Sequence, residues 1–380
     1  MDNRNEKLTH NLIYNSISLN ENENILVEVI GEDGLELANE IIKQAKIINA
    51  KPHLNIINYE DLRNFLINAT KEDIIEYGKK DYEIMKKMQA YIGISAPTSD
   101  KSLNGVSQEK LELYNKYYTA LVHLEQRVKH TKWCILRYPN EYFAKKSNMT
   151  LNEFKDFYYN VCNVDYNKMK IAMEPLKELM NKTDKVHIVA PGTDLTFSIN
   201  GIPAEKYYGT FNIPDGEVAT CPVKNSVNGY ITYNTKTKYN DIIFEDIKFD
   251  FINGKIVKAT AKENSKELNE ILDTDDGARY IGEFAFGLNP YVNNTMCDTL
   301  FDEKINGSFH LTPGMALEES DNGNRSAIHW DIVKILRKEF GGGEIYFDDI
   351  LIMKDGKFIL RAQRIKRWKF KINIETEFYD

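Results

Sequence analysis

The chain has 380 residues, of which 42% are hydrophobic and 28% charged, as expected of a soluble globular protein with room for two domains. Lysine and arginine together number 49 and aspartate and glutamate 57, so the net charge is −8. This balance argues against a nucleic-acid-binding protein, which would carry a basic face, and is compatible with an enzyme that gathers carboxylates around a cation.

The N-terminal region and the cysteines indicate the compartment. The first stretch, MDNRNEKLTHNLIYNSISLNENE, is polar and lacks the apolar segment of a signal peptide. No apolar run approaches the ~18 residues that a transmembrane helix needs. The four cysteines form no C-x-x-C pair, which favours reduced thiols over disulfides or a thiolate metal site. We therefore expect a cytoplasmic protein with no membrane association.

The first half of the chain alternates between strand and helix patterns. Four short runs rich in β-branched residues predict strands at 24–30, 52–58, 90–96 and 132–139. The segments between them carry apolar residues at helical spacing, so we expect βαβ units and a mostly parallel sheet. The turn IGEDGLE contains only Gly31 and Gly34, and no dinucleotide site is expected there. The predicted fold class is α/β, with an N-terminal domain over 1–185.

From about residue 186 onward the patterns are mainly those of strands, separated by Gly, Asn and Pro turns. KDGK at 354–357 predicts a hairpin, and KENSKELNEILD at 262–273 is the one clear helix pattern. We therefore expect a β-rich α+β C-terminal domain over 186–380.

The stretch AIHWDIV places a histidine and an aspartate two residues apart in an apolar run. If it forms a strand, His329 and Asp331 point to the same face. A buried imidazole beside a buried carboxylate is costly unless both are satisfied. A divalent metal would satisfy them, and so would a plain His–Asp hydrogen bond, so this pair alone leaves both readings open.

Further acids and a second histidine lie in similar surroundings. Glu217 follows a Pro-Asp-Gly turn, and Glu283 lies in the apolar segment IGEFAFG. The stretch DTLFDEKINGSFHL supplies Asp302, Glu303 and His310. Each has an ordinary explanation as a turn carboxylate, an ion-pair partner or a hydrogen-bonded core histidine.

Taken together, these residues favour a metal site. Mixed imidazole and carboxylate ligands suit zinc, cobalt, manganese or ferrous iron, and the scarcity of thiolates argues against a structural zinc site. Four or more carboxylates exceed what one catalytic zinc needs. They suit two metals about 3.5–4 Å apart, with a carboxylate between them.

Five segments occur in the order, and at nearly the spacing, of the M29 family of metallo-aminopeptidases: NIPDGEV, IGEFAFGLNP, NTMCDTLFDE, GSFHLTPGMAL and NRSAIHWDIV. The similarity extends back through APGTDLTFSI and RYPNEYFAKKSNMTLNEFKDFYY, so it covers most of the chain. The resemblance implies a homodimer that cleaves N-terminal residues from peptide substrates with two divalent metal ions, Zn, Co, Mn or Mg, bound in the C-terminal domain. It places the family's ligand and catalytic residues on Glu217, Glu283, Glu303, His310, His329 and Asp331. Within this set, Glu283 and Glu303 are the implied catalytic carboxylates.

The chain departs from the family after His310. The resemblance implies a tyrosine seven positions further on, but Leu317 stands there, and Pro313 interrupts the pattern. Leucine cannot donate a hydrogen bond to a reacting oxygen. Two other functions therefore stay open. One is a ring-cleaving dioxygenase with a single iron held by His310, His329 and Asp331, and the other is a weakly active relative that binds metal or peptides.

Overall fold

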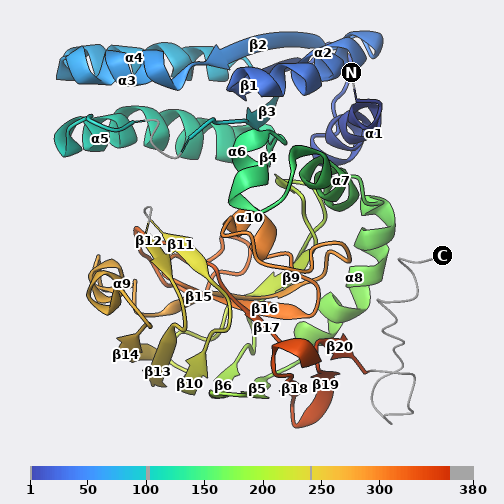
Figure 1. The fold of residues 1–380 in the computed structure, drawn as a ribbon, viewed down its shortest axis with the longest axis vertical. Coiled ribbons are helices and arrows are strands. Elements are labelled where there is room, and N and C mark those ends of the chain that lie inside the picture. The colour runs from blue at the N-terminus through green and yellow to red at the C-terminus, as the bar shows by residue number, and fades with distance from the viewer. Residues whose placement is uncertain (1, 100–102, 240–241, 360–380) are drawn as a thin grey trace. The chain divides into compact units, whose positions relative to one another are not determined.

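The computed structural model describes residues 2–99, 103–239 and 242–359, and Figure 1 labels their helices and strands. These residues group into two compact units. The first unit runs to Val164 and includes Gly209–Pro214, and the second comprises Asp165–Tyr208 and the chain from Asp215 onward. A division at residue 185 into two independently folding domains stays a prediction.

The first unit is built on a parallel sheet whose described strands have the order β2-β1-β3-β4-β8. Their bounds are β1 Asn24–Ile30, β2 Lys51–Ile57, β3 Ala90–Ser95, β4 Lys132–Arg137 and β8 Asn212–Ile213. The first four are the strands predicted from the sequence. The inner residues of β1 are all buried, as expected for a parallel strand covered on both faces. The short strand β8 was not predicted, because two residues carry no periodic pattern.

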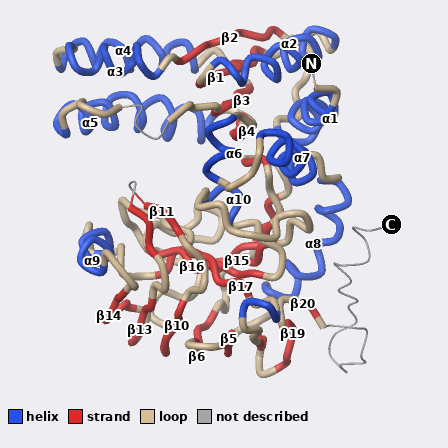
Figure 2. The backbone as a smooth tube through the Cα atoms, in the orientation of Figure 1, coloured by secondary structure: helices blue, strands red, loops and turns tan. Residues whose placement is uncertain are grey.

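Helices alternate with these strands along the chain, as Figure 2 shows. The α-helices are α1 Arg4–His10, α2 Leu35–Ile47, α3 Tyr59–Asn68, α4 Lys71–Met85, α5 Gln108–Tyr114, α6 Glu141–Lys146 and α7 Leu151–Cys162. Two π-helical segments, Asn11–Ser16 and Asn115–Val128, continue α1 and α5. Two of the α-helices begin at capping boxes, Thr70 with Asp73 and Thr150 with Glu153, in which each side chain bonds the backbone N–H of the other residue. The predicted α/β fold class is confirmed in this unit.

The second unit contains two larger antiparallel sheets. One has the order β14 (Lys255–Thr260), β13 (Lys248–Ile252), β10 (Asn228–Thr232), β6 (Thr193–Ser198), β5 (Lys185–Ala190), β18 (Glu344–Phe347), β19 (Ile350–Lys354) and β20 (Lys357–Phe358). The other has the order β17 (Ile332–Ile335), β16 (Ser308–Pro313), β15 (Ile281–Gly287), β9 (Glu217–Thr220) and β7 (Glu205–Tyr207). We call this second one the site sheet.

Smaller elements complete the second unit. They are the strand pair β11 (Thr237–Tyr239) and β12 (Ile242–Phe244), and the helices α8 (Tyr166–Met180), α9 (Ser265–Leu272) and α10 (Thr299–Asp302). Helix α9 lies within the predicted helix 262–273. The predicted hairpin joins β19 to β20, with Asp355 and Gly356 at positive φ values of 50° and 77°, as a tight primed turn requires.

Aromatic side chains on one face of the site sheet pack toward the larger sheet. Phe284 meets Phe197 of β6 with ring centroids 5.0 Å apart, and Phe286 meets Phe347 of β18 at 6.1 Å. Phe309 of β16 lies on the same face and contacts Phe284 at 6.2 Å. Because side chains alternate along a strand, Glu283 and His310 must project from the opposite face. The apolar core thus fixes which face of the site sheet carries the polar residues.

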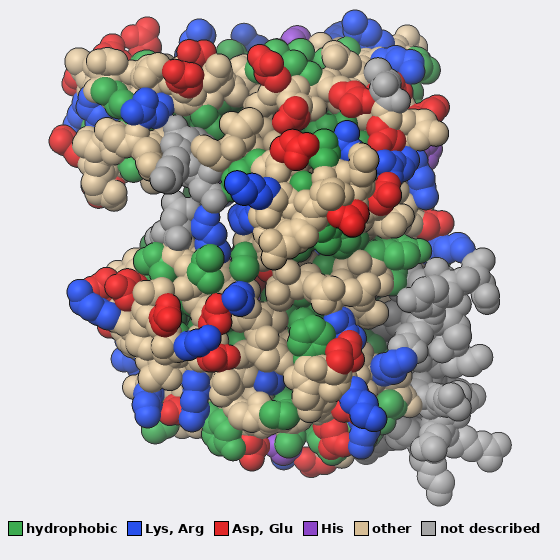
Figure 3. Space-filling view, in the orientation of Figure 1, with side chains coloured by type: hydrophobic (Ala, Val, Ile, Leu, Met, Phe, Trp, Pro, Cys, Tyr) green, Lys and Arg blue, Asp and Glu red, His purple; other side chains and the backbone are tan. Residues whose placement is uncertain are grey.

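The sequence predicted neither a membrane-spanning helix nor a disulfide. Among the described residues, no helix is both long and apolar enough to cross a membrane. Nor does any cysteine among them form a disulfide. On the face shown in Figure 3, lysine and arginine side chains are interspersed with aspartate and glutamate.

Candidate metal centre

Three neighbouring strands of the site sheet bring Glu217, Glu283 and His310 together. Glu217 begins β9 and lies directly opposite Gly287 of β15. His310 of β16 lies opposite Ala285, two residues after Glu283. Directly paired residues of antiparallel strands share a face, and so do residues two apart in one strand. The register therefore places all three side chains on the face away from the phenylalanines.

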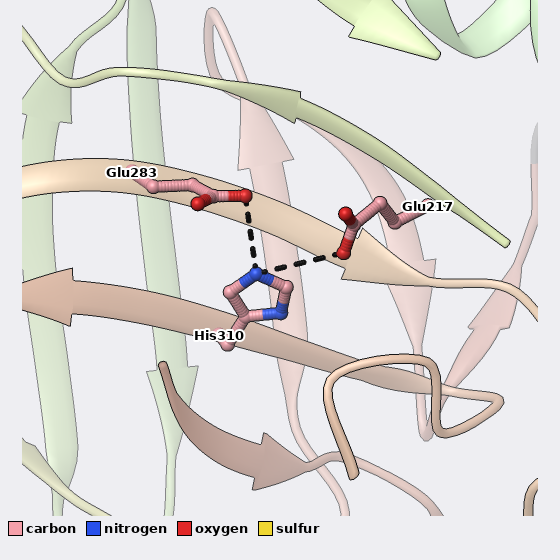
Figure 4. A group of neighbouring side chains, drawn as sticks. All are labelled: Glu217, Glu283 and His310. Carbon is pink, nitrogen blue, oxygen red and sulfur yellow. Dashed lines mark hydrogen bonds and ion pairs between the residues drawn. The ribbon is translucent and has the colours of Figure 1, made fainter. Parts of the chain in front are cut away.

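The carboxylates of Glu217 and Glu283 converge on one imidazole nitrogen of His310, as Figure 4 shows. Nε2 of His310 lies 3.3 Å from Oε1 of Glu283 and 3.7 Å from Oε2 of Glu217. All three residues are buried. Oε2 of Glu217 accepts no hydrogen bond among the described residues. A buried carboxylate oxygen without a donor is costly, and a bound cation would satisfy it.

A second cluster forms around the other oxygen of Glu283. Nε2 of His329 lies 3.2 Å from Oε2 of Glu283 and 3.4 Å from Oδ1 of Asp331. Nδ1 of His329 lies 2.9 Å from the carbonyl oxygen of Met315 and is placed to donate to it, so that the neutral ring would offer the lone pair of Nε2 to a cation. Oδ1 of Asp331 accepts a hydrogen bond of 2.6 Å from Thr312.

The stretch AIHWDIV forms a strand only in part. His329 forms an isolated bridge with Gly314, and Asp331 immediately precedes β17. Both side chains nevertheless turn toward Glu283, as alternation predicts.

Glu283 is common to the two clusters. One comprises Glu217, Glu283 and His310, and the other Glu283, His329 and Asp331; within each, the candidate ligand atoms lie within 4.8 Å of one another. The two oxygens of Glu283 face different histidines, at 3.3 Å and 3.2 Å. A carboxylate shared in this way is the arrangement that two-metal sites use to bridge their ions. The residues present fit two divalent cations.

The charged groups of the two clusters shift one another's pKa values. Burial opposes a charge on His310, yet Glu283 and Glu217 raise the pKa of this imidazole to about 9. Burial also raises the pKa of Glu217 to about 7, although Lys304 opposes that shift. For Asp331, burial favours the neutral form, but His329 holds the pKa of this carboxyl well below its usual range. Without a cation, protonated imidazoles supply the positive charge that the carboxylates need.

Sequence reasoning missed a buried lysine beside the first cluster. Lys304 follows α10 and has an exposed fraction of 0%. Its Nζ lies 2.7 Å from Oε1 of Glu217, 2.8 Å from Oε1 of Glu303 and 3.3 Å from Oδ1 of Asp215. No spacing rule identifies it, because a run such as FDEKIN is typical of a solvent-exposed segment.

Glu303 lies near the centre but belongs to neither of the two clusters. It is buried and paired with Lys304. Burial raises its pKa well above the usual range of a glutamate, although the charge of Lys304 opposes that shift. Its predicted role as ligand and catalytic group stays a prediction. Asp302, also noted in the sequence, accepts a hydrogen bond of 2.6 Å from the backbone N–H of Met296 and is a structural residue.

The sequence model of the family described as "Thermophilic metalloprotease (M29)" matches residues 1–358. Aminopeptidase PepS of Streptococcus thermophilus is 26% identical over 381 aligned positions, which cover 86% of this chain and 91% of that protein. Aminopeptidase AmpS of Bacillus subtilis is 32% identical over 164 positions, 39% of each chain.

Wild-type AmpT from Thermus thermophilus is a solved structure with the same fold, with a TM-score of 0.78 over 94% of this chain and 99% of that one, at 19% sequence identity. At this level of identity the likeness supports the fold, including the combination of a parallel sheet with large antiparallel sheets.

Proposed function

The chain belongs to the M29 family of thermophilic metalloproteases and is a metal-dependent aminopeptidase, and we propose that it acts through two divalent metal ions bound side by side. The proposed ligands are Glu217, Glu283, His310, His329 and Asp331. The observation that carries the proposal is the position of Glu283, whose two carboxylate oxygens each face a different histidine.

When bound, two such cations supply Lewis acidity, which lowers the pKa of a water molecule and polarises a peptide carbonyl. The residues of the chain have complementary tasks. Glu283 holds the two halves of the site at a fixed separation. Lys304 neutralises one oxygen of Glu217 and leaves Oε2 available. The dense negative charge also suits the protonated N-terminal amine of a peptide substrate.

We assign proton transfer to Glu303. Its carboxylate lies outside both clusters and is therefore not committed as a ligand there. A carboxyl whose pKa is raised by burial accepts a proton more readily than an ordinary glutamate. In the proposed step Glu303 takes a proton from the attacking water and passes it to the leaving amine.

The mixture of imidazole and carboxylate ligands suits zinc, cobalt or manganese, with magnesium as a harder alternative. The direct test is to strip the protein with a chelator, add one metal at a time and assay a panel of aminoacyl arylamides. We expect about two metals per chain at full activity. Full turnover by protein with a single metal per chain would contradict the dinuclear proposal.

The single-iron dioxygenase is the less favoured alternative. His310, His329 and Asp331 would form its triad, but this leaves the buried Oε2 of Glu217, which accepts no hydrogen bond among the described residues, without a cation to satisfy it. The family match and the relatives named as aminopeptidases also favour hydrolysis. A purified protein with one iron per chain that opens a dihydroxypyridine ring would overturn the assignment. No turnover of any arylamide with any metal would favour the weakly active binding protein.

We further propose a homodimer located in the cytoplasm. Both expectations come from the family resemblance and the sequence. Sedimentation at micromolar concentration tests the first, and cell fractionation tests the second.

A further inference from the structure

A phenol from the edge strand β7 lies beside the candidate metal centre. Tyr207 is paired directly with Glu217 between β7 and β9. Directly paired residues of antiparallel strands project from the same face. The side chain of Tyr207 therefore stands on the face that carries Glu283 and His310, and it is half-buried there.

The hydroxyl of Tyr207 reaches the loop that follows β16, where it lies 3.4 Å from Oε2 of Glu319. Burial, and then the charges of Glu319, Glu283 and Glu217, raise the pKa of the phenol above its ordinary value. The direct pairing of Tyr207 with Glu217 keeps the phenol on the side of the ligand carboxylates. A phenol is protonated at neutral pH in any case, with an ordinary pKa of about 10, so its hydroxyl can donate a hydrogen bond.

The loop itself offers no such donor at Leu317. The backbone N–H of Leu317 bonds the carbonyl of Gly282 at 3.3 Å, which fixes this residue next to Glu283. Its side chain is a hydrocarbon. Glu319 lies two residues further on, so Tyr207 brings a hydroxyl from β7 to the loop in which Leu317 stands.

We propose that Tyr207 donates a hydrogen bond to the oxygen of the scissile carbonyl as negative charge develops on it. This inference rests on the proposed hydrolysis of peptides. As the water oxygen bonds to the carbonyl carbon, the π electrons move to the carbonyl oxygen; when they return, the C–N bond breaks and the amine leaves with a proton. Tyr207 keeps its own proton throughout and stabilises the transient oxyanion.

A donor of this kind acts on the transition state more than on bound substrate. Its removal should therefore lower kcat and leave KM nearly unchanged. The loss of one oxyanion donor typically reduces kcat by about 10²–10³. If Tyr207 only supported the metals, its replacement would instead change the metal content.

The test is Tyr207→Phe, which removes the hydroxyl and keeps the ring. Three quantities are measured: kcat and KM on an aminoacyl arylamide, metal per chain, and affinity for an aminoalkylphosphonic acid whose tetrahedral oxygens resemble the oxyanion. We expect kcat to fall by about 10²–10³, and metal content to stay at the wild-type level. The phosphonic acid should bind at least tenfold more weakly.

Two matched variants separate this role from general effects. Tyr208→Phe removes the neighbouring phenol, whose ring contacts the ammonium of Lys170 at 4.9 Å, and should keep wild-type kcat. Glu319→Gln preserves an acceptor for the hydroxyl of Tyr207 and should change kcat by less than about threefold, as expected for a long hydrogen bond to an exposed group.

Different outcomes would contradict the proposed hydrolysis and the role of Tyr207. A metal-loaded wild-type protein that hydrolyses no arylamide would defeat the proposed function. An active wild type with an equally active Tyr207→Phe variant would overturn the role of Tyr207 alone. So would a Tyr207→Phe variant that loses metal and activity in proportion, or a Glu319→Gln variant that loses as much kcat as Tyr207→Phe.

Discussion

The ammonium of Lys304 lies 2.7 Å from Oε1 of Glu217, and both side chains are buried. The contact fixes which oxygen of Glu217 is neutralised by the protein and which one faces His310. A carboxylate held in this way is oriented before a cation arrives. The lysine thus acts as a permanent positive charge beside the two proposed metal ions, which can exchange.

Replacing this charge should destabilise the protein strongly. In Lys304→Met, the carboxylates of Asp215, Glu217 and Glu303 lose a common counter-charge. Breaking a buried pair by removing one partner typically costs about 3–5 kcal/mol. We expect a loss of this order in urea unfolding of the metal-free protein, and a smaller loss when metal is present.

A lysine at the surface provides the control for this measurement. Lys177 pairs with Glu205 at 2.7 Å, but both side chains are partly exposed. Lys177→Met should have a much smaller effect, because surface ion pairs contribute little. Equal losses in the two variants would show that the burial of Lys304 has no special importance.

The second prediction concerns His329, which contacts Glu283 and Asp331 from a partly exposed position. In His329→Ala the remaining carboxylates lose a ligand partner and repel each other. We expect metal content and activity to fall together, while the circular dichroism spectrum changes little. The unfolding midpoint of the metal-free protein should fall, because Glu283 and Asp331 lose the imidazole that neutralises them. Elemental analysis of the purified variant is the deciding measurement, and undiminished metal content would remove His329 from the ligand set.

Much of this site follows from alternation along strands. In IGEFAFG and GSFHLTP, phenylalanines alternate with Glu283 and His310, and the aromatic face is the one buried against the larger sheet. A sequence with this pattern can place its polar residues on only one face. The register between strands is set by long-range pairing, so the shared position of Glu283 between two histidines was not derivable from spacing alone.

Lys304 and Tyr207 mark where sequence reasoning ended. Each lies next to Glu217 only because of tertiary structure: Lys304 lies just after α10, and β7 pairs with β9. The strand containing Tyr207 spans three residues, too few to show a period. A buried lysine within a charged stretch reads as an exposed one until its burial is known.

The third prediction is a pH dependence of the metal-free protein. Folding raises the pKa of His310 to about 9 and that of Glu217 to about 7, both above their unfolded values of 6.5 and 4.5. At pH values between the unfolded and the folded pKa of each group, the folded state therefore binds more protons than the unfolded state. The stability that these protonated groups contribute is lost as pH rises toward 9. We expect unfolding free energy in the presence of a chelator to fall between pH 6 and pH 9, by a few kcal/mol (about 1.4 kcal/mol per unit of pKa shift).

Saturating metal should flatten this dependence, because cations bind the deprotonated forms of the same groups and release protons. His310→Gln, which cannot titrate, should weaken the slope of the metal-free protein. A metal-free wild type that is more stable at pH 9 than at pH 6 would contradict the proposed proton balance.

The last prediction tests how closely the segment around Lys304 must approach the site sheet. Gly287 lies opposite Glu217, and a Cβ there would lie 2.3 Å from the carbonyl oxygen of Ile305 and 2.9 Å from that of Glu303. Because both contacts are to backbone atoms, Gly287→Ala must displace the segment that carries Lys304. We expect activity and metal affinity to fall although no ligand is altered.

Gly201→Ala is the control: its φ of +76° imposes strain, but a Cβ there meets nothing within 4 Å. It should cost about 1–2 kcal/mol of stability and keep kcat and metal content. If both variants keep full activity, the backbone around Lys304 can shift without disturbing Glu217, and the close approach at Gly287 serves packing alone.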